Sequence, residues 1–411
     1  MTADSRQPSP QDAYARWVAA CAGAGWHPEP AIEQVPVQAG LGRVTALAVH
    51  ARRASPRFAC AAMDGIALAW SSLGADAGVP APAFSWVDTG DSLPAGTDTV
   101  VERERVAVCA DGSALVTGAV TRGRNVRAVG EDFPAGRLLV SGGHRLRPAD
   151  LGAAATAGYV TLAVARRPAV AIIPTGDEIR PVGSALGPGE FTDSNSVMLA
   201  ALAARCGALP TVTDVQPDDP ERLAAAVRQA SSTADLVLVL AGSSRGRDDH
   251  TATVLAQVGG VAVHGVAVRP GHPVLLGHVR TGRPGADSPG SAGRSAMAVP
   301  AIGVPGYPLA AAVIFELFAA PLLQKLEGQR TADREPVQAR LGCDWNSPPG
   351  VEDWVPVSLD AGPDSPVAVP SAGHGAGSLS RLVRADAWWP IPIGQGPFAR
   401  GDRIEVLPVG I

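Results

Sequence analysis

Two runs of apolar residues, each ending in a polar glycine turn, constrain the fold of this chain most strongly. The run AVAIIP at 169–174 is followed by TGDEI, and the run DLVLVLA at 235–241 is followed by GSSRGRDD. A short apolar run bounded by turn residues is typical of a strand that is buried on both faces. Open α/β sheets bind ligands beyond the carboxyl ends of such strands, so both loops are candidate binding segments.

The two loops carry the residue types of a phosphate and cation site. The first supplies Thr175, Gly176, Asp177 and Glu178, and the second supplies Gly242, Ser243, Ser244, Gly246, Asp248 and Asp249. Small residues let backbone N–H groups approach phosphate closely, and hard divalent cations prefer carboxylate oxygens. The loops therefore predict a site for a phosphorylated ligand and a divalent cation. The alternative for the second loop is a surface turn whose acids pair with Arg245 and Arg247.

Strand-like and helix-like segments alternate from residue 167 to about 327. Strands are expected at AVAIIP, ALPTVTDV and DLVLVLA, and helices at NSVMLAALAARCG, PERLAAAVRQASS and TATVLAQVG. A long apolar helix is expected to end at Leu326. This order predicts a mostly parallel sheet with helices on both faces, in an α/β/α domain of residues 167–327. Residues 280–296 are rich in Gly, Ser and Pro and are interpreted as a hairpin tip rather than a site.

The remaining segments indicate further domains, as expected for a chain of 411 residues. Residues 11–26 have helical spacing and lead into an extended segment, which residues 146–166 are expected to rejoin. We therefore group residues 1–52 with 146–166 as an N-terminal helical and extended arm. Short β-like runs predict an inserted β-rich domain at 53–145 and a small C-terminal β-barrel at 328–411.

Composition excludes several classes of function. The net charge of −5 and the dispersed Lys and Arg residues give no surface for nucleic acid. The five cysteines lie far apart without a CxxC pair, so neither a zinc site nor a disulfide framework is indicated. We find no signal-peptide pattern at the N-terminus and no apolar run approaching the length of a membrane span. These features predict a cytoplasmic protein without a membrane partner.

A set of ordered motifs runs over nearly the whole chain. The motifs are AAMDGIAL at 61–68, DTGDSLPAGTDTVVERE at 88–104, VRAVGEDFPAGRLLVSGGHRL at 126–146, RRPAVAIIPTGDEI at 166–179, DSN at 193–195, AGSSRGRDD at 241–249, RPGHP at 269–273, VPGYP at 304–308 and HGAGSLSRLVRADAWWPIP at 374–392. Each motif is weak evidence alone, whereas their shared order and spacing are specific. Together they resemble the motifs of the molybdopterin molybdenumtransferase family, called MoeA in bacteria and represented by one half of gephyrin in animals.

The resemblance implies an elongated subunit with an arm, an inserted β domain, a central molybdopterin-binding α/β/α domain and a C-terminal β domain. It implies a homodimer whose active site lies between the central domain of one subunit and the inserted domain of the other. Such enzymes take adenylylated molybdopterin, release AMP with Mg²⁺ present, and place molybdate, or in some relatives tungstate, on the dithiolene. The implied protein partners are a molybdopterin adenylyltransferase and recipient molybdoenzymes.

The resemblance also implies roles for particular residues. As catalytic residues it indicates Asp64, Glu178, Asp249, Arg269 and His272, and Asp64, Glu178 and Asp249 are also the implied metal ligands. The implied cofactor-binding residues are Thr175, Gly176, Asp177, Asn195, Gly242, Ser243, Ser244, Gly246, Pro270, Gly271, Pro305, Gly306, Tyr307 and Ser378.

The residues themselves leave alternatives open. Asp64 also fits the role of a turn-forming residue in an Asp-Gly turn. Glu178 also fits the role of an acid in the first turn of a helix, where the helix dipole favours negative charge. Tyr307 is suited either to stacking on a pterin or adenine ring or to packing at the start of the following helix. Ser378 and Arg381 either contact a phosphate of the pterin or fix a turn.

Several positions depart from the family pattern. Ala241 replaces a glycine, Arg247 stands where an acid is usual, and Asp248 is a candidate to compensate for that acid. Arg269 and His272 replace lysines; arginine is permanently charged, whereas histidine is charged only in acidic conditions. Tyr307 replaces an asparagine, as in a divergent subgroup.

Three functions are therefore considered for this chain. The first is an enzyme that inserts the metal, and the second is a non-catalytic paralogue that binds molybdopterin or an oxyanion. The third is a nucleotide-hydrolysing relative, which the flanking β domains disfavour.

Overall fold

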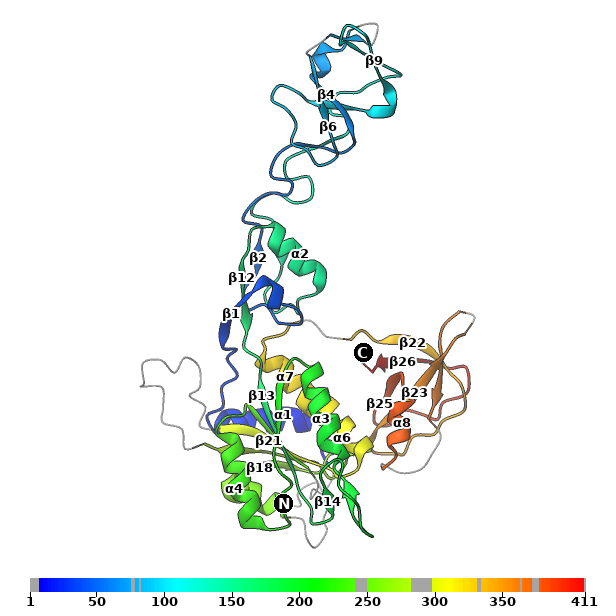
Figure 1. The fold of residues 1–411 in the computed structure, drawn as a ribbon. Coiled ribbons are helices and arrows are strands. Elements are labelled where there is room, and N and C mark those ends of the chain that lie inside the picture. The colour runs from blue at the N-terminus through cyan, green and yellow to red at the C-terminus, as the bar shows by residue number, and fades with distance from the viewer. Residues whose placement is uncertain are drawn as a thin grey trace, which may run out of the picture. The chain divides into compact units, whose positions relative to one another are not determined.

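The computed structural model describes residues 7–74, 78–80, 83–240, 250–281, 298–330, 334–362, 364–371 and 377–409. The chain forms two compact units. Unit 1 comprises Met1–Glu33 and Ala165–Ile411, and unit 2 comprises Gln34–Val164. Figure 1 shows the elements of both units along the chain.

The central element of unit 1 is a six-stranded sheet with the order β16-β13-β17-β21-β20-β18. Its strands are β13 (Ala169–Pro174), β16 (Leu209–Val212), β17 (Leu236–Leu240), β18 (Gly259–His264), β20 (Leu275–Arg280) and β21 (Ala298–Val304). β16, β13, β17 and β21 are parallel, whereas β20 runs antiparallel to β21 and to β18. The predicted mostly parallel sheet is confirmed, with an antiparallel edge.

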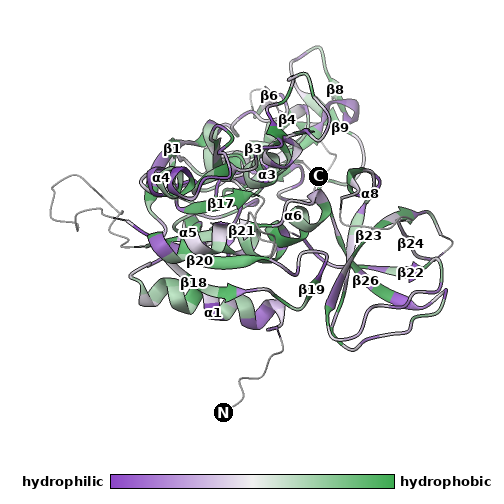
Figure 2. Ribbon diagram, turned by 90° about the horizontal axis from the view of Figure 1, so that it is seen from below, coloured by the Kyte–Doolittle hydropathy of each residue, from purple (hydrophilic) through white to green (hydrophobic). Residues whose placement is uncertain are grey.

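Helices cover both faces of this sheet because its strands are apolar on both sides. In β13, Val170 and Ile172 point into one hydrophobic core, and Ala171 and Ile173 point into the other. The first core is completed by residues of α1, α3, α6 and α7, and the second by residues of α4 and α5. The buried strands carry the hydrophobic colour in Figure 2. The bounds are α1 Pro10–Gly23, α3 Ser194–Arg205, α4 Pro220–Ser231, α5 Thr251–Val258, α6 Pro308–Ile314 and α7 Ala320–Leu326.

The N-terminal helix α1 belongs to this core, which differs from its expected place in an arm. Trp17 is fully buried, and its indole Nε1 donates a hydrogen bond to the carbonyl oxygen of Gly277 in β20 at 2.6 Å. Gly277 has no room for a side chain, because a Cβ would lie 2.4 Å from the carbonyl oxygen of Gly260. Two glycines thus bring β18 and β20 close together beside α1.

A continuous helical stretch, Pro308–Leu326, corrects one expectation. It consists of α6, a π-helical turn at Phe315–Ala319 and α7. With 19 residues and a mean hydropathy of 1.7, it meets the length and composition of a membrane span, although no such run was expected. Since 72% of it is buried inside the protein, the same apolar composition is that of a core helix.

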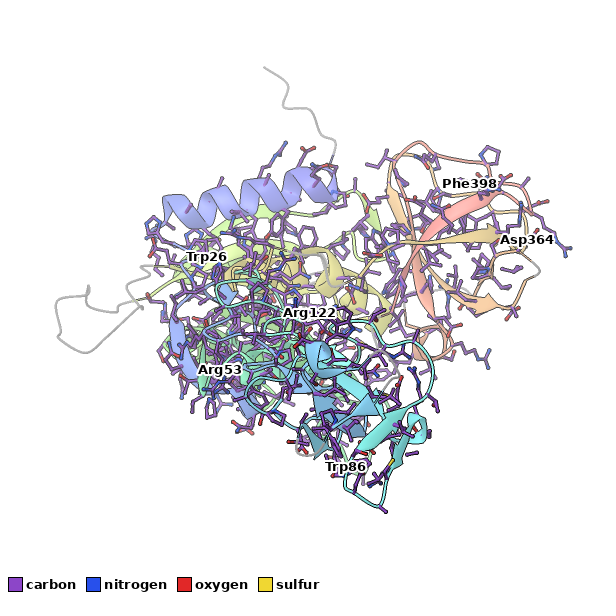
Figure 3. All side chains as sticks on the ribbon, turned by 90° about the horizontal axis from the view of Figure 1, so that it is seen from above. Trp26, Arg53, Trp86, Arg122, Asp364 and Phe398 are labelled. Carbon is purple, nitrogen blue, oxygen red and sulfur yellow. The ribbon has the colours of Figure 1, made fainter. Side chains whose placement is uncertain are left out.

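The C-terminal part of unit 1 forms the predicted barrel. Strands β23, β24, β22, β26 and β25 pair in that order, and an additional β23–β25 pairing closes a five-stranded barrel. Trp389 and Phe398 meet edge to face inside it, with ring centroids 5.0 Å apart, and Figure 3 labels Phe398. The bounds are β22 Val337–Leu341, β23 Glu352–Asp360, β24 Val367–Pro370, α8 Leu379–Val383, β25 Ala387–Ile391 and β26 Arg403–Pro408.

Strand β19 (Val268–Arg269) joins the barrel to the central domain. It follows β18 in the chain but pairs in parallel with β23 of the barrel, with Val268 opposite Glu352 and Arg269 opposite Asp353. The N–H of Glu352 also donates to the carbonyl oxygen of Ala267 at 2.9 Å.

Unit 2 is built of short strands. β1 (Ile32–Pro36) pairs with β12 (Thr161–Ala165), and just before β1 the carbonyl oxygen of Ala31 accepts from the N–H of Arg166 at 2.7 Å. Near these strands α2 (Pro148–Thr156) covers a small apolar core. The other strands are β2 Val49–His50, β3 Cys60–Ala61, β4 Gly65–Leu68, β5 Gly78–Val79, β6 Phe84–Val87, β7 Thr99–Glu102, β8 Val106–Val108, β9 Ala114–Val116, β10 Val126–Arg127 and β11 Leu138–Val140. They form the predicted β-rich part in two- and three-stranded sheets.

Candidate functional site

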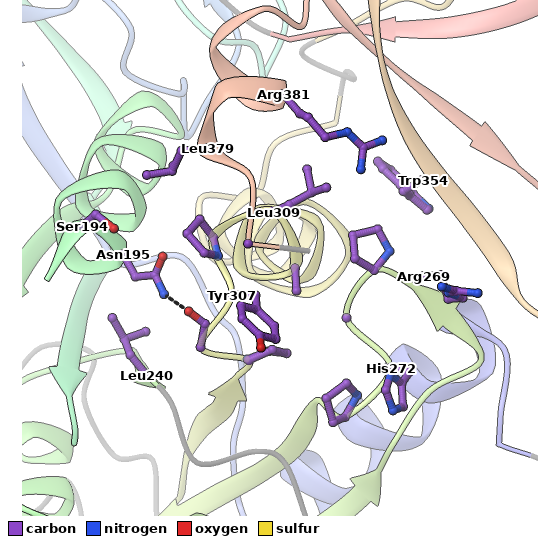
Figure 4. A pocket seen from close by; sticks show the side chains of 18 of the residues that line it. Ser194, Asn195, Leu240, Arg269, His272, Tyr307, Leu309, Trp354, Leu379 and Arg381 are labelled. Atoms are coloured by element: carbon purple, nitrogen blue, oxygen red, sulfur yellow. Dashed lines mark hydrogen bonds between the residues drawn. The ribbon is translucent and has the colours of Figure 1, made fainter. Parts of the chain in front are cut away.

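A cavity of about 1350 Å³ lies in unit 1 beyond the carboxyl ends of β13 and β21. Four segments that sequence analysis singled out line it, namely the TGDEI loop, the start of α3, the RPGHP loop and the VPGYP turn. The barrel supplies its remaining wall (Figure 4). The predicted position at the ends of the parallel strands therefore coincides with a large concavity.

The TGDEI loop contributes Thr175 and Glu178 to the lining. The hydroxyl of Thr175 donates to the carbonyl oxygen of Leu240 at 2.7 Å and so ties the ends of β13 and β17 together. Gly176 has φ +128°, and a Cβ there would lie within 2.9 Å of the Glu178 carboxylate, so the turn requires glycine. Asp177 lies outside the described lining, where it and Asp218 each accept a hydrogen bond from the backbone N–H of the other.

The N-termini of two helices open onto the cavity. The Asp193 carboxylate caps α3 by accepting from the N–H of Ser196 at 3.0 Å. Asn195 donates from Nδ2 to the carbonyl oxygen of Gly306 at 2.7 Å, which holds the VPGYP turn against α3. Oδ1 of Asn195 is buried without a hydrogen-bond partner among the described residues. Helix N-termini carry partial positive charge, so this wall favours anions.

Tyr307 occupies the N-cap position of α6, and the flanking Pro305 and Gly306 also line the cavity. The tyrosine is 65% exposed, so it is not packed into the core at the start of the helix. Its ring faces the chain before α8, because a Cβ added to Gly377 would lie 3.3 Å from Cδ1 of Tyr307. The side chain is therefore available to a ligand, and Figure 4 shows it between Asn195 and His272.

The RPGHP segment places Arg269, Pro270, Gly271 and His272 in the lining. The Arg269–Pro270 peptide bond is cis, and Gly271 has φ +118°. A Cβ on Gly271 would lie 2.9 Å from two carbons of the Ile314 side chain, so the loop sits directly on α6. This close approach fixes the stem from which Arg269 and His272 project.

The barrel wall holds residues that sequence reasoning largely missed. Trp345, Asn346, Asp353 and Trp354 line the cavity, and Arg381, considered above as a turn or phosphate residue, lines it too. The pairing of β19 with β23 helps to bring these residues opposite the RPGHP loop. Ser378 lies outside the described lining, and its hydroxyl is 3.0 Å from that of Ser380.

Two arginines and a carboxylate meet at this wall. Nε of Arg381 is buried without a partner in the described part of the chain, and burial lowers the pKa of Arg381 against the opposing charge of Asp353. Burial also raises the pKa of Asp353, which the hydrogen bond from Ser347 and the charges of Arg269 and Arg381 only partly offset. Guanidinium groups held in this way are suited to a planar or tetrahedral oxyanion.

Asp64 lies in unit 2, where the MDG turn precedes β4. Its Oδ1 accepts from both the N–H and the hydroxyl of Thr89 at 2.7 Å. These hydrogen bonds, with the charge of Arg103, lower the pKa of Asp64 despite some desolvation. The carboxylate is thus held ionised in an exposed turn, a state suited to binding a cation.

The second predicted loop lies outside the described residues, and with it the predicted site residues Gly242, Ser243, Ser244, Gly246 and Asp249. Among the residues that the structure does describe, no group of three or more His, Cys, Asp or Glu side chains is placed to hold a metal ion.

Comparison with known families assigns every major segment of the chain. Residues 9–158 match "MoeA N-terminal region (domain I and II)", residues 171–325 match "Probable molybdopterin binding domain", and residues 338–409 match "MoeA C-terminal region (domain IV)". The chain belongs to the MoeA family. The cavity of this MoeA family member lies between the second and third of these regions, since its lining comes from both.

Individual MoeA relatives match most of the chain. A molybdopterin molybdenumtransferase of Nostoc sp. is 29% identical over 408 residues, covering 92% of this chain and 89% of the relative. The corresponding protein of Haemophilus influenzae is 28% identical over 320 residues and covers 74% and 75%. The crystal structure of the molybdopterin biosynthesis MoeA protein from Pyrococcus horikosii superposes with a TM-score of 0.78 at 27% identity, covering 98% and 99%.

Proposed function

We propose that the protein is a molybdopterin molybdenumtransferase acting in molybdenum cofactor biosynthesis. It binds adenylylated molybdopterin in the cavity, releases AMP and places molybdate or tungstate on the dithiolene. The observation that carries the proposal is the convergence of TGDEI, DSN, RPGHP and VPGYP on one cavity at the carboxyl edge of the sheet. The names of the relatives, molybdopterin molybdenumtransferases, supply the reaction.

Different walls of the cavity are suited to different parts of the ligand. Phosphate oxygens suit the N-termini of α3 and α6, where backbone N–H groups and the helix dipoles favour negative charge. The unpartnered Oδ1 of Asn195 is suited to accept a hydrogen bond from an N–H of a pterin or adenine ring. The oxyanion suits the side facing Arg269 and Arg381, which supply fixed positive charge.

The residues present are compatible with Mg²⁺ as cofactor. Glu178 lines the cavity, and its carboxylate lies beside Gly176 of the same loop. Mg²⁺ usually takes one or two protein carboxylates and completes its shell with substrate phosphates and water. In our proposal Glu178, Asp64 and Asp249 hold the ion, which neutralises charge on the phosphoanhydride when bound. The proposal also includes a cytoplasmic homodimer, in which Asp64 of the partner subunit reaches this cavity.

The alternative is a paralogue that binds the pterin or an oxyanion without releasing AMP. His272 and Tyr307 favour it, since they replace residues usual in the family at the cavity lining. Arg269 keeps a positive charge at its position, so oxyanion binding is expected under either function.

The deciding experiment incubates the purified protein with adenylylated molybdopterin, Mg²⁺ and either molybdate or tungstate, and measures AMP release and metal retained on the pterin. Release that depends on one oxyanion is the result expected for the transferase, and it identifies the metal. Tight pterin binding without release would refute the transferase and support the binding paralogue.

A further inference from the structure

A single buried carboxylate connects three structural elements that build the cavity. Glu316 lies in the π-helical turn Phe315–Ala319, and its side chain is only 2% exposed. The neighbours Phe315 and Phe318 are almost fully buried, so the carboxylate sits in an otherwise apolar helix. An unpaired charge would be costly in this apolar surrounding, so the partners of the carboxylate indicate its structural role.

Each oxygen of Glu316 has its own arginine. Oε1 accepts from Nη2 of Arg205, the last residue of α3, at 2.7 Å. Oε2 accepts from Nη2 of Arg334, which lies just before β22 of the barrel. The other terminal nitrogen of Arg334 donates to the carbonyl oxygen of Pro408 at the end of β26, at 3.1 Å.

These contacts place Glu316 at a junction of the cavity walls. The opposite end of α3 carries Asn195, and the start of the helix that contains Glu316 follows Tyr307. Arg334 lies just before β22 and Pro408 ends β26, and these two strands pair in the barrel. The barrel in turn carries Trp354 and Arg381 into the lining. One carboxylate thus contacts α3 and the barrel from within the helix that begins at the cavity.

We propose that Glu316 is a positioning residue that sets the separation between the helix wall and the barrel wall of the cavity. Buried ion pairs add little net stability compared with apolar packing, but their geometry favours one arrangement over others. A second connection between the same parts is the β19–β23 pairing, which carries Arg269. Apolar contacts between the barrel and the core of the central domain, including those of Trp354 and Trp388, remain when the ion pair is lost, so Glu316 is expected to set the spacing of the two walls and not to hold them together.

The test compares Glu316→Gln with Glu335→Gln in the full-length protein. Glu335 is exposed and adjacent to Arg334, so it controls for loss of one negative charge nearby. Hydrogen exchange is followed at the Glu352 N–H, which bonds Ala267 beside the β19–β23 pairing, and at the β22–β26 ladder within the barrel. We expect about tenfold faster exchange at Glu352 in Glu316→Gln, with the ladder unchanged. Equal exchange at Glu352 in both variants, or equal acceleration at both places, would overturn the proposal.

A ligand measurement extends the test and rests on the proposed function. Molybdate bound between Arg269 and Arg381 touches both walls, whereas AMP at the helix N-termini touches one. Glu316→Gln is therefore expected to weaken molybdate binding about tenfold or more and AMP binding by less than about twofold. Equal weakening of both ligands would refute the positioning role.

A graded pair of substitutions separates positioning from folding. Arg334→Lys keeps a charge for Glu316 but loses the fork that also reaches Pro408, so its exchange rate at Glu352 should fall between those of wild type and Arg334→Met. Identical rates for Lys and Met would contradict the proposal. Absence of AMP release by the wild-type protein would sink the proposed function alone, because the exchange result is independent of activity.

Discussion

Substituting Gly271 by alanine is expected to destabilise the RPGHP loop, which lines the cavity. An alanine at φ +118° is strained by about 1 to 3 kcal/mol. Its Cβ would also lie 2.9 Å from Cγ1 and Cδ1 of Ile314, a fully buried residue with little room to move. Overpacking of this kind costs about 1 to 3 kcal/mol more. The free energy of unfolding of unit 1 should therefore fall by about 2 to 6 kcal/mol in total.

The matched control is Gly183→Ala. Gly183 has φ +90° but open space where a Cβ would go, so it reports backbone strain without the clash. Urea unfolding gives the two stabilities, and calorimetric titration with molybdate gives the binding cost of displacing Arg269 and His272. A double-mutant cycle with Ile314→Val, which removes one of the two clashing carbons, should give a favourable coupling energy of at least about 0.5 kcal/mol. Equal losses in Gly271→Ala and Gly183→Ala, with full molybdate affinity, would refute the packing argument.

Three further changes test other parts of the molecule. Burial opposes ionisation of Asp150, but hydrogen bonds led by those from Arg147 lower its pKa from 3.8 to about 2. Asp150→Asn should therefore lower the free energy of unfolding of unit 2, measured with urea, by about 2 kcal/mol at pH 7. The difference from wild type should disappear as pH falls from about 4 to about 2, where the native carboxylate becomes protonated. A difference that persists unchanged at pH 2 would contradict this sign. Trp17→Phe removes the hydrogen bond to Gly277 and should destabilise unit 1 by about 2 kcal/mol while leaving unit 2 unchanged, as followed by hydrogen exchange in each unit. Asp64→Asn should reduce AMP release by about two orders of magnitude and leave pterin affinity nearly unchanged in a binding assay, and undiminished turnover would remove Asp64 from the site.

The periodicity of the chain was sufficient to predict the sheet and its layers. Val170 to Ile173 point alternately into two cores, which explains why the run AVAIIP is apolar throughout, and that run is visible in the sequence. The place of α1 was not predictable from the same signal. Its burial depends on the close approach of β18 and β20 at Gly277 and Gly260 and on the hydrogen bond from Trp17 to Gly277, which are contacts between segments far apart in the sequence.

Site residues were predictable where a local sequence pattern places them, and not where pairing between distant strands places them. Thr175 follows β13, Asn195 lies in the first turn of α3 and Tyr307 precedes α6, so their positions at the sheet edge could be expected. Trp354 and Arg381 reach the same cavity because β19 leaves the central domain and pairs with the barrel, a pairing between segments more than 80 positions apart that no local pattern specifies.

The hydrogen bond between Ala31 and Arg166 shows that the chain leaves unit 1 and returns to it at one point. An intervening segment with adjacent ends has the properties of a cassette, since its removal leaves a gap that a short turn can bridge. Unit 2 could therefore be gained, lost or exchanged during evolution without rebuilding the sheet that carries the cavity. Asp64 would travel with the cassette and Glu178 would stay, so recombination at this point could separate the acids of the proposed reaction while preserving both folds.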